Sequence, residues 1–369
     1  MKRQPDSLAA SPLSSIGSWV GSTSLVIFTV TVVVVSVFRN GLHVSGWLDT
    51  SASYVSEFPV ETDWNSSSIL PIAISRLLPD EIERYVLTFL PGYVVLGVLA
   101  VSVWRRFSSQ SRLASRIAIV GLLMSPVASI LMGNGEVGTD WLTIAGIFVF
   151  VLAQRRSTAA LGVAVAALSH PEQALVAMTL LLIVSRTYGR VVAPRRAAIA
   201  LASTAVVFIS IQVWLTLAST SSSRLALLAS RLTDMVLNFA VDFNGAIYAA
   251  FAAGWVLLVF WFWSASQQRR GNPWPIAVAV GLTLGFTAAT FDGTRVSAAV
   301  STGLLATAIL AVAQLVADTE ARSGEHATSI AGSVFLFFVL MPAIVWRWSE
   351  FYFGSTSWEK LLEVISHGN

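Results

Sequence analysis

One stretch of the sequence, residues 157–185, constrains the fold more than any other. Its two apolar runs are separated by a polar hinge at residues 169–173, Ser-His-Pro-Glu-Gln. Arginines flank both ends of the stretch: Arg155, Arg156, Arg186, Arg190, Arg195 and Arg196. Basic loops remain on the inner side of a membrane, so both ends belong on one side, which a single span cannot achieve. The sequence therefore predicts a hairpin of two half-length helices with His170 and Glu172 at its tip.

The composition indicates a membrane protein with several spans. Of the 369 residues, 55% are hydrophobic and only 12% are charged, and the mean hydropathy is +0.72. These values exclude an ordinary soluble domain. The net charge of +3 comes mostly from arginines in short loops, which indicates topology signals and not a nucleic-acid surface. The sequence has no cysteine, which excludes disulfides, thiolate catalysis and cysteine-bound metals.

Apolar windows predict an all-α polytopic membrane protein. Windows of ~20 residues mark about eleven hydrophobic segments, two of them half-length. Residues 18–348 then form one transmembrane domain, which includes an outer loop at 39–83 and the hairpin at 157–185. Residues 1–17 are expected as a polar cytoplasmic N-terminus, and residues 349–369 as a short amphipathic tail outside. This topology predicts a multi-pass protein of the cell membrane whose C-terminus is outside.

Several local expectations follow from the same pattern. The first span is expected at Trp19–Phe38 and the last at Ile330–Trp346. The arginines of residues 105–116 predict an inner loop. A short amphipathic helix is expected at Ile69–Leu78, and an interfacial segment with a polar side at Leu225–Phe239.

The candidate site consists of ionisable residues in the outer turns. Turns that meet on one face can build a site between helices. Alternatively, the residues of outer loops are polar simply because they contact water. The residues chosen are Asp63, Glu136, Asp140, His170, Glu172, Asp292 and Arg295.

Each carboxylate has a chemical and a structural interpretation. Asp63 precedes a short helix, and its carboxylate could act as a general base, bind a metal or simply begin that helix. Glu136 lies in the glycine-rich turn of residues 133–140 and could bind a sugar hydroxyl or a cation. In the structural interpretation, that turn only joins two spans and Asp140 caps the second helix.

The candidate cationic residues of the site are His170 in the hinge and Arg295 in the turn before residue 296. Pro171 suits the first position of a helix, whose N-terminus would attract a phosphate. His170 could donate a hydrogen bond to that phosphate or shuttle a proton, or it could be bonded to a neighbouring carbonyl at a kink. Asp292 and Arg295 could pair with each other, or Arg295 could bind phosphate.

With these residues in hand, the chain resembles the membrane glycosyltransferases of the C-type fold (GT-C), which use polyprenyl-phosphate-linked sugars. One span is followed by an acidic outer loop with a short helix, here Asp63 through Leu78. Gly133-Asn134-Gly135-Glu136 with Asp140 is similar to the family's Gly-Gln-x-Asp turn. Leu161–Val176 is similar to its small-residue helix, hinge and second short helix, with His170 in place of the usual basic residue. The resemblance covers mainly residues 19–185.

The resemblance implies inverting transfer of a hexosyl or pentosyl group on the outer face, from a polyprenyl-phosphate donor to a glycan or lipid acceptor of the cell envelope. By analogy Asp63 is the catalytic base, and Arg295 and His170 stabilise the departing phosphate. No cofactor is assigned, but a divalent cation with Asp63 and Glu136 as candidate ligands stays open.

Other functions also stay open. An O-antigen-type polymerase or ligase would rely on Arg295, Arg231 and His170 instead of a carboxylate. A non-catalytic subunit or a transporter of lipid-linked sugars is the third class, although transporters usually have related halves.

Overall fold

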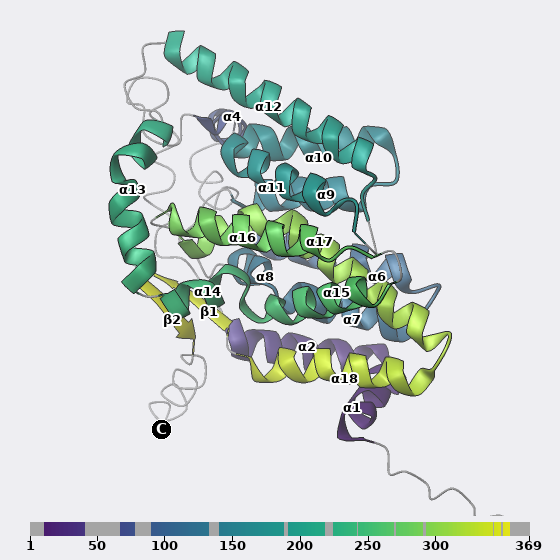
Figure 1. The fold of residues 1–369 in the computed structure, drawn as a ribbon. Coiled ribbons are helices and arrows are strands. Elements are labelled where there is room, and N and C mark those ends of the chain that lie inside the picture. Colours follow the sequence, from purple (N-terminus) through teal and green to yellow (C-terminus); the bar gives the residue numbers. More distant parts are fainter. Residues whose placement is uncertain are drawn as a thin grey trace, which may run out of the picture.

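The computed structural model describes residues 11–40, 67–77, 90–132, 140–187, 191–217, 224–241, 243–268, 271–290, 293–341, 343–347 and 350–354. Within these ranges the chain is helical apart from one small β-hairpin, in agreement with the predicted all-α class (Figure 1). The helices are α1 (Pro12–Ser22), α2 (Leu25–Asn40), α4 (Ile69–Leu77), α6 (Leu90–Phe107), α7 (Arg112–Met124), α8 (Pro126–Leu131), α9 (Asp140–Leu152), α10 (Arg156–Ser169), α11 (Pro171–Val184), α12 (Pro194–Leu217), α13 (Arg224–Val241), α14 (Phe243–Phe251), the 3-10 helix η2 (Ala252–Gly254), α15 (Trp255–Gln267), α16 (Trp274–Ala288), α17 (Gly293–Glu320) and α18 (Gly324–Leu340). The strands are β1 (Ala343–Arg347) and β2 (Glu350–Gly354).

Three helical stretches are long and apolar enough to cross a membrane. They are Pro194–Leu217, Phe243–Gln267 and Arg295–Glu320, and the bent pair α1–α2 makes a fourth if it counts as one span. The prediction of about eleven segments is therefore not reproduced as spans in the described residues. Many of its segments are apolar helices of 10–17 residues, shorter than the ~20 residues that a bilayer requires. α17 is the central helix, because 94% of its apolar window is buried, against 22% for α12 at the edge.

The first predicted span is wrong as a single helix. α1 and α2 are bent by 118° where they meet, near the start of the expected segment Trp19–Phe38. Thr23 leaves the helical conformation there, with φ −58° and ψ 148°. The polar run Ser22-Thr23-Ser24 favours such a break, because hydroxyl side chains compete for backbone hydrogen bonds. α1 lies against α18, where a side chain on Gly17 would collide with the backbone of Thr328.

The predicted inner loop of residues 105–116 is also wrong in extent. Arg105 and Arg106 are in the last turn of α6, and α7 begins at Arg112. Ser111 caps α7, since its Oγ accepts a hydrogen bond from the amide of Ala114 at 2.9 Å. Arg116 is consequently a buried residue of the helix and not a loop residue.

The predicted pair of short helices is present at residues 157–185. α10 and α11 are separated by His170, whose φ of −155° and ψ of 84° end the first helix, and Pro171 starts the second. Arg196, in the first turn of α12, donates to the carbonyls of Ala153 at 2.7 Å and Phe150 at 2.5 Å. The chain therefore returns after α11 to the place where α9 ended, which is the path expected of a hairpin.

The hairpin is held by a close crossing of α9 and α10. An added Cβ on Gly162 would lie 2.6 Å from the amide nitrogen of Phe150, and one on Gly146 would lie 2.6 Å from that of Ala166. Only glycine permits backbones to approach so closely, as in membrane helix pairs with small residues at their interface. The crossing fixes α10, and with it the position of His170.

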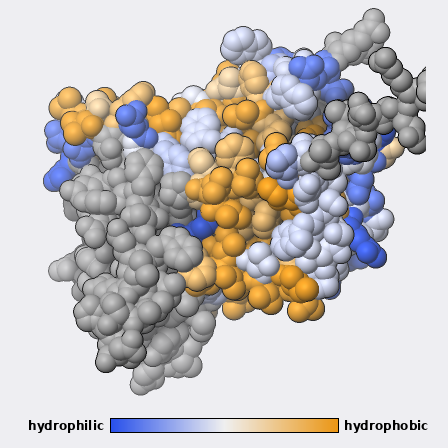
Figure 2. All heavy atoms as spheres, turned by 90° about the horizontal axis from the view of Figure 1, so that it is seen from below, coloured by the Kyte–Doolittle hydropathy of each residue, from blue (hydrophilic) through white to orange (hydrophobic). Residues whose placement is uncertain are grey.

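Apolar side chains are exposed along several helices. Figure 2, seen from the side of α1, α2 and α18, shows hydrophobic residues gathered on that face. Those that α2 contributes include Val26, Ile27, Val30 and Val33. α12 exposes Ile199, Val206, Ile209 and Val213 in the same way. Exposed aliphatic surfaces of this extent are typical of helices that face lipid.

The last predicted crossing, Ile330–Trp346, is wrong at its end. α18 stops at Leu340, and residues 343–347 form strand β1, which pairs antiparallel with β2 at residues 350–354. Pro342 explains the stop, because proline has no N–H for the helical hydrogen bond. The expected outer tail of residues 349–369 thus begins as a strand, and its residues 355–369 lie outside the described ranges.

Candidate functional site

Four elements bring polar side chains to one end of the helix bundle. They are the N-termini of α9 and α17, the junction of α10 and α11, and the start of α4 (Figure 1). α11 and α9 both contact α17, and α4 contacts α10. The predicted residues Asp140, His170, Glu172 and Arg295 are on these elements, at the end of the bundle opposite Arg196.

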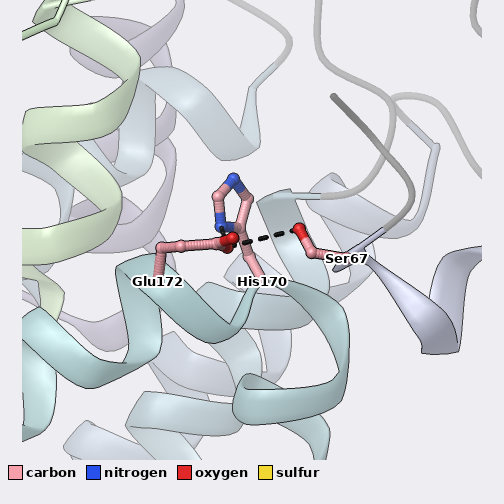
Figure 3. Close-up of polar contacts among 3 residues, drawn as sticks. All are labelled: Ser67, His170 and Glu172. Carbon is pink, nitrogen blue, oxygen red and sulfur yellow. Dashed lines mark hydrogen bonds and ion pairs between the residues drawn. The ribbon is translucent and has the colours of Figure 1, made fainter. Parts of the chain in front are cut away.

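His170 and Glu172 form one pair at the hairpin tip. The Nδ1 atom of His170 lies 3.2 Å from Oε2 of Glu172, and the two side chains are 16% and 17% exposed. The hydroxyl of Ser67 donates to the same carboxylate oxygen at 3.4 Å. Figure 3 shows the second ring nitrogen of His170 pointing away from Glu172 and Ser67. A carboxylate on Nδ1 fixes the orientation of the ring and directs Nε2 outward.

Ser67 is a residue of the site that sequence reasoning missed. It is buried and precedes α4, the short helix that was expected at Ile69–Leu78 and is found at Ile69–Leu77. Its bond to Glu172 joins α4 to the hairpin across more than a hundred residues of sequence. A serine in a run of three serines, Ser66-Ser67-Ser68, has no pattern that singles it out.

Asp140 and Arg295 form a second pair. The Nε atom of Arg295 lies 3.5 Å from Oδ2 of Asp140, whose side chain is 6% exposed against 29% for Arg295. Asp140 is the first residue of α9, where the positive end of the helix dipole stabilises a carboxylate. The expected pairing of Arg295 with Asp292 lies outside the described residues, whereas the pairing with Asp140 joins α17 to α9.

Gln173 is the second residue that sequence reasoning missed. It follows Glu172, is 3% exposed, and neither atom of its side-chain amide has a hydrogen-bond partner among the described residues. The indole nitrogen of Trp141 and the hydroxyl of Thr143, on α9, are likewise buried with no partner in the described part of the chain. Buried polar groups nearly always have partners, so the first turns of α9 and α11 are suited to a polar ligand. In the sequence, Gln173 is an uncharged residue at the start of an apolar segment, and nothing except its neighbour Glu172 indicated that it belongs to a site.

Three of the predicted site residues lie outside the described residues: Asp63, Glu136 and Asp292. The metal ligands proposed for a divalent cation, Asp63 and Glu136, are among them. Within the part of the chain that the structure describes, no group of three His, Asp or Glu side chains could hold a metal ion. Arg231, which the polymerase alternative requires, is exposed on α13.

No protein-family model matches the chain, and no curated protein and no solved structure matches it either.

The two pairs can act on an anionic substrate. The guanidinium of Arg295 can form paired hydrogen bonds with phosphate oxygens, and the outward nitrogen of His170 can donate another when the ring is protonated on both nitrogens. Asp140 balances the charge of Arg295 in the absence of substrate, and Glu172 faces the Nδ1 atom of His170. The Asp140–Arg295 pair also joins α9 to α17, whereas the His170–Glu172 pair lies within the hairpin.

Proposed function

We propose that the protein is a membrane glycosyltransferase that takes a sugar from a polyprenyl-phosphate donor and transfers it to a cell-envelope acceptor. The observation that carries the proposal is the presence of a His–carboxylate pair and an Arg–carboxylate pair at one end of an apolar bundle. A phosphate on a lipid is an anion delivered at the boundary of the membrane, which suits cations placed at helix ends. The resemblance of residues 19–185 to the GT-C family supports the same reaction.

The reaction is a single displacement at the anomeric carbon. A carboxylate, by the resemblance Asp63, takes the proton of the acceptor hydroxyl, and the oxygen forms the new bond to the anomeric carbon. The bond between that carbon and the phosphate oxygen breaks, and its electron pair leaves with polyprenyl phosphate. Configuration at the anomeric carbon is inverted. Arg295 and His170 stabilise the charge that develops on the phosphate, an effect typically worth about 3–4 kcal/mol for each well-placed donor.

Glu172 and Gln173 have supporting roles in this proposal. Glu172 holds the imidazole of His170 so that one nitrogen faces the substrate. Gln173, whose amide is buried and has both a donor and an acceptor, is suited to a sugar hydroxyl near the phosphate. Ser67 links this group to α4, the helix that follows the segment with Asp63.

The test is a transfer assay with the full-length protein in proteoliposomes. Synthetic polyprenyl phosphates that carry a radiolabelled hexose or pentose serve as donors, and membranes from cells that lack the gene supply the acceptor. His170→Ala and Arg295→Met should each lower the transfer rate by about 100-fold or more. Asp63→Ala should abolish transfer while the protein stays folded.

Matched controls come from the opposite end of the bundle. His326 and Arg322 are exposed there, and His326→Ala and Arg322→Met should transfer at the rate of the unaltered protein. Full activity of Asp63→Ala with an inactive Arg295→Met would replace the proposal by the polymerase or ligase alternative. If no donor is used, and donor accumulates on the inner face of gene-deleted cells, the protein is a transporter and the proposal fails.

A further inference from the structure

α13 differs from the other long helices in its exposure. It has 18 residues, and most of its described side chains are exposed. Leu232, Val236, Leu237 and Val241 are 45–88% exposed, although all four are large and apolar. Of the side chains described on this helix, only Met235 is fully buried. Because so little of this helix is covered by protein, its apolar side chains require an apolar environment outside the described part of the chain.

The residues of α13 are arranged as in an amphipathic helix. Leu232, Met235, Val236 and Phe239 are at positions i, i+3, i+4 and i+7 of the helix, so they form a single stripe. Met235 and Phe239, on one edge of the stripe, are buried or half-buried, and Leu232 and Val236, on the other edge, are exposed. Arg231, Asp234 and Asn238 are exposed on the opposite side of the helix, and Leu237 and Val241 lie between this polar side and the exposed edge of the stripe. The polar side therefore suits water, and the apolar arc from Leu232 to Val241 does not.

The orientation of α13 is also unlike that of its neighbours. In Figure 1, α12, α16 and α17 run lengthwise through the bundle, whereas α13 runs across their ends at the left. α13 contacts α14 and α16, and α14 contacts α17. The end that it covers is the end with Arg295 and His170. If the long helices cross a membrane, a helix across their ends lies parallel to the membrane plane.

The apolar surface of α13 continues onto lipid-facing helices. Phe243, at the start of α14, is exposed beside the aromatic ring of Phe239, with ring centroids 5.8 Å apart. α16, which α13 contacts, exposes Val278, Leu282 and Phe286 along its length. An exposed apolar edge that continues the exposed apolar surface of a neighbouring helix is explained by a common solvent, the bilayer, without a partner protein.

We propose that α13 is an interfacial helix that lies in the headgroup region of the membrane, with Leu232 and Val236 in the upper acyl region and Arg231 and Asn238 in water. Helices of this kind bury their apolar face ~5–10 Å below the headgroups. The occupant of the exposed edge is thus the lipid itself. The consequence is that α13 sets the depth of the bundle, so that Asp140–Arg295 and His170–Glu172 lie at the headgroup level. The inference does not depend on the proposed function, because it concerns only where this end of the bundle meets the membrane.

The absence of cysteine makes a direct test possible. Single variants Leu232→Cys and Val236→Cys, and the matched variants Arg231→Cys and Asn238→Cys on the water side, are labelled with an environment-sensitive fluorophore. The full-length proteins are reconstituted into phosphatidylcholine–phosphatidylglycerol vesicles. Quenching is measured with iodide in water, with a nitroxide near the headgroups and with a nitroxide near the chain ends. All four positions are exposed, so the substitutions should not disturb folding, and circular dichroism checks this.

The expected result is opposite quenching on the two sides of one helix. Probes at residues 232 and 236 should emit at shorter wavelength and be quenched several-fold more by the shallow nitroxide than by the deep one. Probes at residues 231 and 238 should be quenched mainly by iodide. Equal quenching of all four by iodide would show that α13 is in water and overturn the proposal. Protection of residues 232 and 236 from iodide and from both nitroxides would show a protein partner and overturn it too. The assay reads depth in an inactive protein as well, so its failure is distinguishable from failure of the proposed transferase activity.

Discussion

Charged side chains within the bundle have different partners in the candidate site and at three arginines elsewhere. We call these three arginines the arginine clamps. The clamps are Arg39, Arg116 and Arg196, and each binds backbone carbonyls near the end of another helix. Arg116 donates to Val20 and Thr23 at the end of α1, and Arg196 donates to Phe150 and Ala153 at the end of α9. Arg39 donates to Met341 after α18 at 3.0 Å and to Leu123 in α7 at 3.5 Å.

Each clamp also has its guanidinium over a phenylalanine ring. The distances from the guanidinium carbon to the ring centroid are 5.1 Å for Arg39 over Phe338, 5.1 Å for Arg116 over Phe28 and 5.0 Å for Arg196 over Phe150. The last carbonyls of a helix lack donors within the helix and carry partial negative charge. An arginine supplies hydrogen-bond donors to these carbonyls, and its positive charge balances their partial negative charge. The ring adds a cation–π contact.

The candidate site uses side chains for both partners instead. Arg295 faces the carboxylate of Asp140, and His170 faces that of Glu172. Carbonyls are fixed by the helix and cannot be protonated, whereas a carboxylate can lose its partner to a ligand or take up a proton. The comparison teaches that the clamps tie helix ends together through fixed backbone groups, whereas the charges of the candidate site are paired with side chains that a ligand can displace.

Removal of a clamp should have the largest effect on stability. Arg196→Met removes two charge-assisted hydrogen bonds to half-buried carbonyls at the end of α9, so the free energy of unfolding should fall by about 3 kcal/mol. Thermal unfolding in detergent micelles, followed by tryptophan fluorescence, measures the loss. The control Arg322→Met alters an exposed arginine and should leave the transition unchanged. Equal stability of the two variants would mean that the clamp is not structural.

The crossing that positions the hairpin should be the next most sensitive feature. Gly162→Ala places a methyl group 2.6 Å from the backbone of α9, and the forced separation should lower the free energy of unfolding by about 2 kcal/mol. Gly281→Ala is the matched control, since no atom lies within 4 Å of its new Cβ. The control should be neutral or slightly stabilising, because alanine favours a helix more than glycine does. The same thermal scan compares them, and a Gly162→Ala protein as stable as Gly281→Ala would refute the close crossing.

A change within a side-chain pair should lower stability less than the clamp and glycine variants do. Its main effect should be on activity. Glu172→Gln keeps an acceptor for Ser67 but loses the charge beside His170, so the free energy of unfolding should change by less than about 1 kcal/mol. Transfer should fall by about tenfold, because the imidazole loses the carboxylate that orients it. Unfolding and transfer are measured on the same preparation. A large loss of stability with normal transfer would place Glu172 among the structural residues, with the clamps.

Much of the helical framework could be predicted from hydrophobic windows. α4 and α13 begin and end within two residues of the helices expected at Ile69–Leu78 and Leu225–Phe239, because each has an apolar periodic run that polar residues or proline interrupt. The break at His170 was also predictable, since arginines at both ends of residues 157–185 required the chain to turn back. These are local signals, and a single sequence contains them.

The features that were not predicted depend on contacts between residues far apart in sequence, and a hydrophobic window of ~20 residues does not contain both partners. Arg116 was expected in a loop because clustered arginines mark inner loops, and the carbonyls of α1 that it binds within the helix bundle come from a distant segment. One of these carbonyls belongs to Thr23, where α1 and α2 bend. Ser67 and Gln173 belong to the candidate site through burial and position, and neither residue type signals a function. The pairing of Asp140 with Arg295 joins residues far apart in sequence.

The crossing of Gly146 and Gly162 keeps α10 in register with α9. Gly162 is near the middle of the helix, and there the backbones of α9 and α10 touch with no side chain between them. The close contact continues for a further turn, where Gly146 faces the backbone of Ala166. Backbones that interlock over a turn resist sliding, so the tip with His170 and the arginine-flanked start of α10 are held at fixed positions along α9.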